Sequence, residues 1–188
     1  MYAKCVGAGA CDPPHLTRSY TRNNYYGNPE FDNYPVIYVS WNDVAAYCAW
    51  ADSRLPTEAE WEKAASWDEK NNKKNIYPWG DKLNCQFANY SGCVGDVIMV
   101  GTNKVGQSPY GAYDMAGNVW EWVADWYDVY PGGDQNASQG FGKKYRVLRG
   151  GSWGYINGHV NSAYRFTGDP MINTPDIGFR CAQNVEIP

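Results

Sequence analysis

The chain has 188 residues, with 16 basic and 20 acidic side chains, a formal charge of −4 and no run of Lys or Arg. A protein that binds nucleic acid as its main partner carries a basic patch, so this class is excluded. No apolar stretch is long enough to span a membrane, and the first residues do not resemble a secretory signal. The length predicts a single domain with a sizeable core, and nine Trp, 16 Tyr and 20 Gly favour a loop-rich domain over a helical bundle.

Two helices are predicted in the first half of the chain. Residues 1–35 are rich in Gly, Pro, Asn and Tyr, which predicts a loop-dominated arm, and residues 34–39 have the composition of a short strand. Ser40 is a suitable cap for a helix over 41–51. Thr57 and Glu60 form a capping-box pattern that begins a second helix, which we expect to end near Ser66. We expect a charged loop over 68–75 and a tight turn over 77–81.

The chain is organised around residues 146–182. Two short β-prone runs frame it: residues 146–149, directly followed by Gly150, and residues 177–181, which contain Gly178. Glycine allows backbones to approach closely. Between them the sequence has neither a strand period nor a helix period. An irregular insert framed by two strands is typical of a binding face, and equally of an ordinary surface loop. Residues 84–111 are nearly all turn formers, so we expect a disulfide or a bound cation to hold them.

The six cysteines predict disulfides rather than a zinc site. Cys5 with Cys11 and Cys85 with Cys93 are two local pairs, each closing a small polar loop. Zinc needs clustered ligands, but the sequence has no CxxC motif and only two histidines. Disulfides imply an oxidising compartment, so we expect an extracellular or cell-surface location.

Five motifs then occur in order: LPTEAEWE (55–62), YPWG (77–80), GNVWEW (117–122), RGGSW (149–153) and GFRC (178–181). Together they resemble the formylglycine-generating-enzyme (sulfatase-modifying factor) domain over residues 34–182. The resemblance implies an α+β, C-type-lectin-like fold with little regular secondary structure, a small twisted antiparallel sheet, two helices and long loops. It also implies one such domain over residues 1–188, beginning just inside the usual domain start, so we expect a C-terminal fragment of a longer protein. Cys48 and Cys181 match the family's structural disulfide.

The resemblance argues against catalysis by this chain. Catalytic members bind Cu(I) with two cysteines shortly after the Gly-Gly-Ser-aromatic motif, and the equivalent residues here are Tyr155 and Val160. A second branch, the ergothioneine-type sulfoxide synthases, holds iron with three histidines from an adjoining helical domain. That histidine set is not in this sequence. We therefore expect a domain without copper and without enzymatic activity.

The remaining relatives bind ligands, and the framed insert is similar to the variable proteins of diversity-generating retroelements. Asn codons mutated at adenine never yield Lys, Glu, Gln, Met or Trp, and residues 154–170 contain none of these five types. We predict an unknown protein or surface ligand as the partner of the insert. The alternative is a copper-free enzyme-derived or accessory domain of the same superfamily. The predicted contact residues are Tyr155, Ile156, Asn157, His159, Asn161, Phe166, Thr167 and Asp169, with Met171, Ile172 and Asn173 at the rim.

Three other residues of this stretch have separate expectations. Trp153, Tyr164 and Arg165 are predicted to belong to the frame, as a buried anchor and an internally paired arginine. His159 is a conceivable general base. However, it has no nucleophile or carboxylate partner in its own motif, which favours an ordinary loop residue.

The resemblance also implies structural calcium, which prefers carboxylate and carbonyl oxygens. One predicted set combines two side chains and two main-chain carbonyls over eight residues: Asp114, Gly117, Val119 and Glu121. The other reading of this set is that its carboxylates are plain surface charges. A second predicted set follows the same scheme: Asn89, Tyr90, Asp96 and Ile98.

Overall fold

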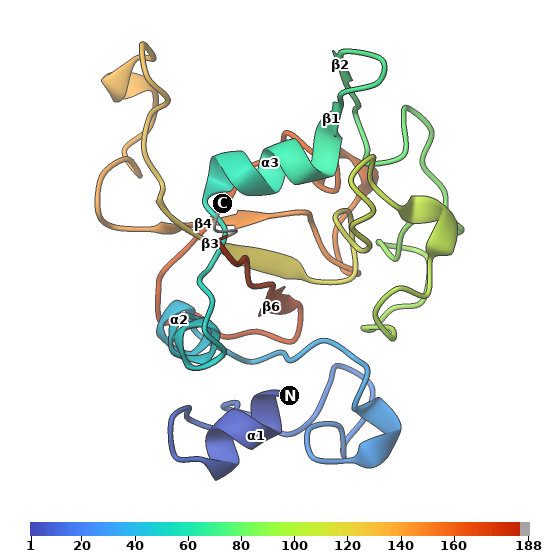
Figure 1. Ribbon diagram of the computed structural model, residues 1–188, viewed down its shortest axis with the longest axis vertical. Coiled ribbons are helices and arrows are strands. Elements are labelled where there is room, and N and C mark those ends of the chain that lie inside the picture. Colours follow the sequence, from blue (N-terminus) through green and yellow to red (C-terminus); the bar gives the residue numbers. More distant parts are fainter. Residues whose placement is uncertain (185–188) are drawn as a thin grey trace.

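The centre of the fold is a four-stranded sheet in the order β5-β4-β3-β6 (Figure 1). It is seen in a computed structural model that describes residues 1–184. The strands are β3 (Trp120–Trp126), β4 (Arg146–Arg149), β5 (Phe166–Gly168) and β6 (Ile177–Phe179). β4 pairs antiparallel with β3 and β5, and β6 pairs parallel with β3. The predicted α+β fold is confirmed, with one parallel pair in a sheet expected to be antiparallel.

The sheet separates two packed layers because successive side chains of a strand point to opposite faces. On one face, Trp120, Trp122 and Leu148 pack in one apolar cluster with residues of α1 (Tyr2–Gly7) and α2 (Trp41–Trp50). On the other face, Val123 and Val147 pack with Trp61 of α3 (Glu58–Ser66). Figure 1 shows α3 above the sheet, with α1 and α2 below it.

The two predicted helices begin at the predicted caps. The Ser40 hydroxyl accepts a hydrogen bond from the Asp43 amide, and the Asp43 carboxylate accepts one from the Ser40 amide. Thr57 and Glu60 form the same reciprocal arrangement at the start of α3. Each cap satisfies two amides that a helix leaves unpaired, which explains why these two boundaries follow from the sequence.

Three local predictions are wrong. The arm over residues 1–35 contains α1, which buries Tyr2 and Cys5, so residues 1–184 have three α-helices rather than two. Residues 34–39 form no strand, because Tyr38 has a φ angle of 58° and cannot continue an extended run. The loop expected over 68–75 contains a two-stranded hairpin of β1 (Trp67–Asp68) and β2 (Lys73–Lys74).

Covalent closure agrees with the prediction. Disulfides join Cys5 to Cys11, Cys85 to Cys93, and Cys48 to Cys181. The last bond ties α2 to the chain just after β6, across 133 positions. No helix within residues 1–184 has the length and apolar character needed to cross a membrane.

Candidate functional site

The insert begins at two glycines that bring it against the frame. Gly150 and Gly151 follow β4 with φ angles of 92° and 76°, in the region that favours glycine. A Cβ atom on Gly151 would lie 2.5 Å from Cγ1 of Val160 and 2.9 Å from the carbonyl oxygen of His159. The Gly-Gly pair therefore allows the main chain at 159–160 to pack directly on the end of β4.

Arg149, the last residue of β4, holds the insert from within. Its side chain is fully buried and donates hydrogen bonds to three carbonyl oxygens, those of Ser162 (2.8 Å), Ala163 (2.9 Å) and Tyr164 (2.7 Å). It also pairs with Glu62 of α3. All three carbonyls are main-chain groups, so these bonds do not depend on which side chains the insert carries.

Other segments hold the main chain of the insert in the same way. Further hydrogen bonds join its backbone to segments outside it. Examples run from the Ser91 amide to the Tyr155 carbonyl (3.0 Å), from the Ser162 amide to the Ile76 carbonyl (2.8 Å), from the Trp41 amide to the Pro170 carbonyl (2.9 Å) and from the Tyr38 amide to the Thr174 carbonyl (3.1 Å). The insert is irregular in secondary structure, but its path is fixed at several points.

The two positions expected to hold copper-binding cysteines are filled by packing. Val160 is fully buried. The Tyr155 ring lies edge-on to Trp120 with centroids 5.2 Å apart, and Phe166 stacks on Trp120 at 5.1 Å. Burial raises the pKa of the Tyr155 phenol. A valine and a neutral phenol cannot replace the thiolates that Cu(I) requires.

The eleven predicted contact residues divide into two groups by exposure. The exposed group can meet a partner directly: Ile156, Asn157, Asp169, Met171 and Ile172. The half-buried group lies lower in the insert: Tyr155, His159, Asn161, Phe166, Thr167 and Asn173. Tyr155 and Phe166 pack against the core cluster, so part of their surface is committed to folding.

His159 is placed as an aromatic neighbour. Its ring lies edge-on to Tyr164 with centroids 4.7 Å apart, and its Nδ1 is buried without a hydrogen-bond partner among the described residues. A general base needs a partner that orients it, so this arrangement does not favour base catalysis. Trp153 is half-buried, with its ring 4.9 Å from that of Tyr20, and Arg165 is internally paired as predicted.

In the first predicted cation set, Oδ2 of Asp114 accepts a hydrogen bond from the Gly101 amide at 2.7 Å, and Oδ1 accepts none from the described residues. Asp114, Val119 and Glu121 line a cavity of about 430 Å³ together with Arg180. Burial raises the pKa of Asp114, and the nearby charge of Glu121 adds to this, whereas Arg180 and the Gly101 amide oppose it. Burial therefore leaves Asp114 with the electrostatics of a ligand whose charge is incompletely balanced.

The Glu121 carboxylate, by contrast, is already occupied. It accepts hydrogen bonds from Nε and a terminal nitrogen of Arg180, at 2.5 and 2.6 Å, and from the Trp61 indole at 2.6 Å. The guanidinium thus supplies the positive charge that a cation would otherwise bring. The first set fits calcium at Asp114 and competes with Arg180 at Glu121. Calcium binding at this set stays a prediction.

The second predicted set fits a cation less well. The Asp96 carboxylate accepts hydrogen bonds from Ser19, Tyr20, Thr21 and Val97 and pairs with Arg22 at 3.0 Å. Its lone pairs are therefore used by the N-terminal arm.

Two further groups of this set differ in availability. Oδ1 of Asn89 is buried without a partner, which is what a missing ligand would leave, while the Ile98 carbonyl already accepts from Asn118. Within residues 1–184, no three or more His, Cys, Asp or Glu side chains are grouped so that they could hold a metal ion.

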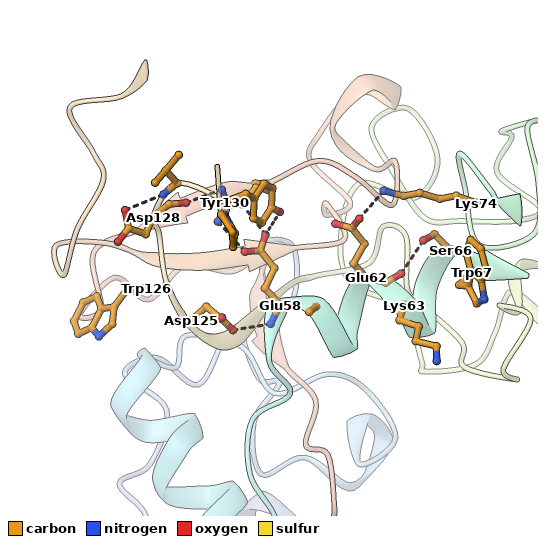
Figure 2. Close-up of a pocket in the computed structure, with 14 residues that line it drawn as sticks. Glu58, Glu62, Lys63, Ser66, Trp67, Lys74, Asp125, Trp126, Asp128 and Tyr130 are labelled. Carbon is orange, nitrogen blue, oxygen red and sulfur yellow. Dashed lines mark hydrogen bonds and ion pairs between the residues drawn. The ribbon is translucent and has the colours of Figure 1, made fainter. Parts of the chain in front are cut away.

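A larger pocket, of about 660 Å³, lies beside α3. Figure 2 shows Glu58 and Tyr130 at its centre. Arg165 donates two hydrogen bonds to the Glu58 carboxylate, at 2.7 and 2.8 Å, and its guanidinium lies 4.1 Å from the Tyr130 ring centroid. Burial and then the charge of Glu58 raise the pKa of Tyr130 to about 12.

Nothing in the sequence indicates this pocket. The capping pattern of Thr57 and Glu60 predicts the start of α3, and Arg165 is predicted to be an internally paired frame residue; both predictions are correct locally. The walls come from α3, β1, β2, the 125–131 segment and the start of β5, so no single stretch of sequence carries the pattern. A spacing-based signal for it does not exist in the chain.

The whole described chain matches one family model. The model is that of the sulfatase-modifying factor enzyme 1-like domain, and it matches residues 2–185. The chain belongs to this family. Bos taurus inactive C-alpha-formylglycine-generating enzyme 2 is 42% identical over 171 residues, which cover 82% of this chain and 52% of the relative. Mus musculus formylglycine-generating enzyme is 38% identical over 170 residues, which cover 80% and 44%.

These relatives place both an active and an inactive enzyme at similar distance from the chain, which spans about half of their length. Among solved structures, Treponema denticola variable protein 1 superposes with a TM-score of 0.67 at 24% identity, covering 86% of this chain and 75% of that one. At this identity the likeness shows a shared fold. Family membership therefore fixes the scaffold and leaves the activity to be argued from the site.

Proposed function

We propose that this domain is a non-catalytic module that binds a protein or cell-surface ligand with the exposed side chains of its insert. The observation that carries the proposal is the way the insert is held. Arg149 and the amides of Ser91 and Trp41 bind its carbonyl groups, so the conformation depends on main-chain contacts. Exposed side chains on such a support can change without loss of the fold, which is what a recognition surface needs.

The chemistry of the exposed group suits recognition of another macromolecule. Ile156 and Met171 each expose 60% of their surface, and Ile172 exposes 38%. Asn157 and Asp169 lie among them as exposed polar neighbours. Apolar area that is already rigid contributes to binding at a low entropy cost, and adjacent polar groups provide specificity.

The absence of copper ligands supports a role other than formylglycine synthesis. Tyr155 and Val160 occupy the two cysteine positions, and both are packed against the core. Because residues 154–170 also lack the five types that adenine mutagenesis of Asn codons excludes, we infer that the domain is a variable protein of a diversity-generating retroelement. An adenine-rich, near-identical copy of codons 146–182 beside a reverse-transcriptase gene would support this, and its absence from the complete genome would contradict it.

The direct experiment is a pair of displayed libraries. The first randomises the exposed residues Ile156, Asn157, Asp169 and Met171. The second randomises four buried residues of the same stretch, Gly151, Ser152, Val160 and Ser162. We expect most members of the first library to fold and most of the second to fail, as measured by protease resistance.

The first library is then selected against one immobilised purified protein that the parent domain does not bind. Recovery of folded binders would support a recognition surface. Failure of most first-library members to fold would show that the exposed side chains are structural, and the proposal would be wrong. If library members fold but lose function whenever one or two particular positions are changed, the result would favour the copper-free enzyme instead.

Two accompanying properties belong to the same proposal. Three disulfides are compatible with an extracellular or secreted module, where thiols stay oxidised. We further infer one structural calcium ion near Asp114, where a divalent cation would balance the half-buried carboxylate and tie the 114–118 turn to the sheet.

A further inference from the structure

The pocket beside α3 has a charge pattern that the proposed function does not use. Its floor is an internally balanced network in which Glu58 and Glu62 pair with Arg165 and Arg149. Tyr130 also donates its hydroxyl hydrogen to Glu58 at 3.0 Å. Every charge of the floor therefore has a partner of opposite sign. These pairs are largely buried, so a ligand charge would have to displace a buried partner there.

The acidic groups with spare capacity lie at one end. Asp125 accepts the Glu58 amide with Oδ2 at 2.6 Å, which places it at the N-terminus of α3. Asp128 accepts the Val129 amide with Oδ1, and its carbonyl accepts from Arg165. No hydrogen bond from a described residue reaches the second carboxylate oxygen of either aspartate; Asp128 is exposed, and Asp125, which lies near the charge of Arg146, is half-buried. Figure 2 shows both aspartates on the side of Trp126.

The basic groups lie at the other end. Lys74 contacts Glu62 through one of its three donors, and Lys63 lies 3.5 Å from Glu69, with 47% and 62% of these two lysine side chains exposed. Figure 2 shows Lys63 and Lys74 beside Trp67, on the side away from the aspartates. The pocket thus has a negative end, a neutral floor with aromatic and apolar walls, and a positive end.

We propose that this pocket binds an extended peptide segment of about four residues, with a basic group at Asp125 and Asp128 and an acidic group at Lys63 and Lys74. The lining residues of α3 run from Glu58 to Ser66, which is about 12 Å of helix. An extended chain covers that distance in about four residues. Trp67, Trp126 and Tyr130 provide the surface on which the apolar middle of the peptide packs. None of the predicted contact residues of the insert lines this pocket, although Arg165 of the insert does.

The probe is the capped tetrapeptide Lys-Leu-Ala-Glu, titrated into the full chain at low ionic strength. Its neutral analogue is Gln-Leu-Ala-Gln, and its all-basic analogue is Lys-Leu-Ala-Lys. We expect the dipolar peptide to bind about tenfold more tightly than the neutral one, and to lose that advantage in salt, because each end contributes one exposed ion pair. Indole NMR signals of Trp67 and Trp126 should shift on binding.

A charge-swap variant makes the assignment specific. In Lys63→Glu/Lys74→Glu we expect Lys-Leu-Ala-Glu to weaken about tenfold and Lys-Leu-Ala-Lys to become the preferred peptide. The matched control, Lys82→Glu/Lys104→Glu, changes the net charge equally at exposed residues outside the pocket and should behave as the parent. If the charge-swap variant fails to fold, Lys63→Gln/Lys74→Gln replaces it and should abolish the preference for the acidic end.

Three results would overturn the proposal: no detectable binding of the dipolar peptide, equal binding of the dipolar and neutral peptides, or the same loss of binding in the control variant. If the insert libraries failed to fold or gave no binders, the peptide titrations of the parent domain would be unchanged. The failure of one proposal is therefore distinguishable from the failure of the other.

Discussion

The two faces of the four-stranded sheet are stabilised by different chemistry. On the α1–α2 face, Trp120 and Trp122 are fully buried among aromatic rings and aliphatic groups. On the α3 face, beside a smaller apolar cluster, Arg149, Glu58 and Glu121 are buried as charged pairs. Tyr155, one of the two residues that the family resemblance predicts in place of a copper-binding cysteine, packs on the aromatic face, and the larger pocket lies on the ionic face.

This difference indicates where change is tolerated. Apolar burial is non-directional, so the loss of one apolar contact leaves no unpaired polar group. A buried ion pair is directional, and removal of one partner leaves a charge without compensation. We therefore expect the ionic face to respond steeply to single substitutions in its floor and weakly to substitutions at its rim. The predictions below test this contrast.

The largest single-residue effect is expected for Arg149→Met. The substitution removes the buried partner of Glu62 and three hydrogen bonds to insert carbonyls, all from a fully buried side chain. Breaking a buried pair costs roughly 3–5 kcal/mol. Urea unfolding measures the loss. The matched control is Arg54→Met, where both partners of the Arg54–Glu60 pair are exposed, and roughly 0–1 kcal/mol is expected. Equal effects of the two substitutions would contradict the contrast between buried and exposed pairs.

The next largest effect is expected from removing the disulfide between Cys48 and Cys181, which lies on the aromatic face. Cys48→Ala/Cys181→Ala opens a link that spans 133 positions and holds α2 against the sheet, and we expect a loss of roughly 2–5 kcal/mol. Cys85→Ala/Cys93→Ala opens a link of only 8 positions and should cost less, because a shorter loop restricts the unfolded chain less. Thermal unfolding under oxidising conditions compares the two. The reverse order would contradict this entropic explanation.

The third prediction concerns Asp114 and combines pH with calcium. The folded-state pKa of this carboxyl is raised, so its contribution to stability is greatest below its unfolded pKa and is lost as pH rises through the folded pKa. In EDTA at pH 7, Asp114→Asn should therefore melt slightly above the parent, and the difference should vanish in acid. Added calcium should raise the melting temperature of the parent and leave the variant unchanged.

Two outcomes would remove the cation from this site: no response of the parent to calcium, or an equal response of the variant. Glu121→Gln is the companion variant, because it loses the pairing with Arg180 as well as a calcium ligand. A calcium response that survives in Glu121→Gln would place the ion at Asp114 alone.

The sequence could predict the features that depend on short local patterns. The caps at Ser40 and Thr57 are each completed within four residues, and both helices begin there. The strands at 146 and 177 frame the insert as expected, because β-prone runs beside glycine are also local signals. The disulfide between Cys48 and Cys181 followed from family resemblance, since a link of that length has no local pattern.

The features that were not predicted are those in which distant segments determine the result. Tyr38 adopts a positive φ where a strand was expected, and its amide bonds the carbonyl of Thr174. Glu58 and Arg165 are separated by 107 positions, and only the folded sheet brings them together in the pocket. The sequence also does not indicate that Arg149 is buried, because a charged residue at the end of a strand is usually exposed. Pairing across such distances requires the topology, which composition and spacing do not supply.

The smallest expected effect comes from the rim of the ionic face. Lys74 and Arg149 both contact the carboxylate of Glu62, but the side chain of Lys74 is 47% exposed and that of Arg149 is buried. Lys74→Gln should therefore cost roughly 0–1 kcal/mol, and the cost should shrink further in salt, because water already solvates the ammonium group and Arg149 still pairs with Glu62. Urea unfolding at two ionic strengths measures it, with Lys104→Gln as an exposed control outside the pocket. A loss comparable to that of Arg149→Met would mean that Lys74 is part of the buried network. In that case the positive end of the pocket would not be free to bind a ligand.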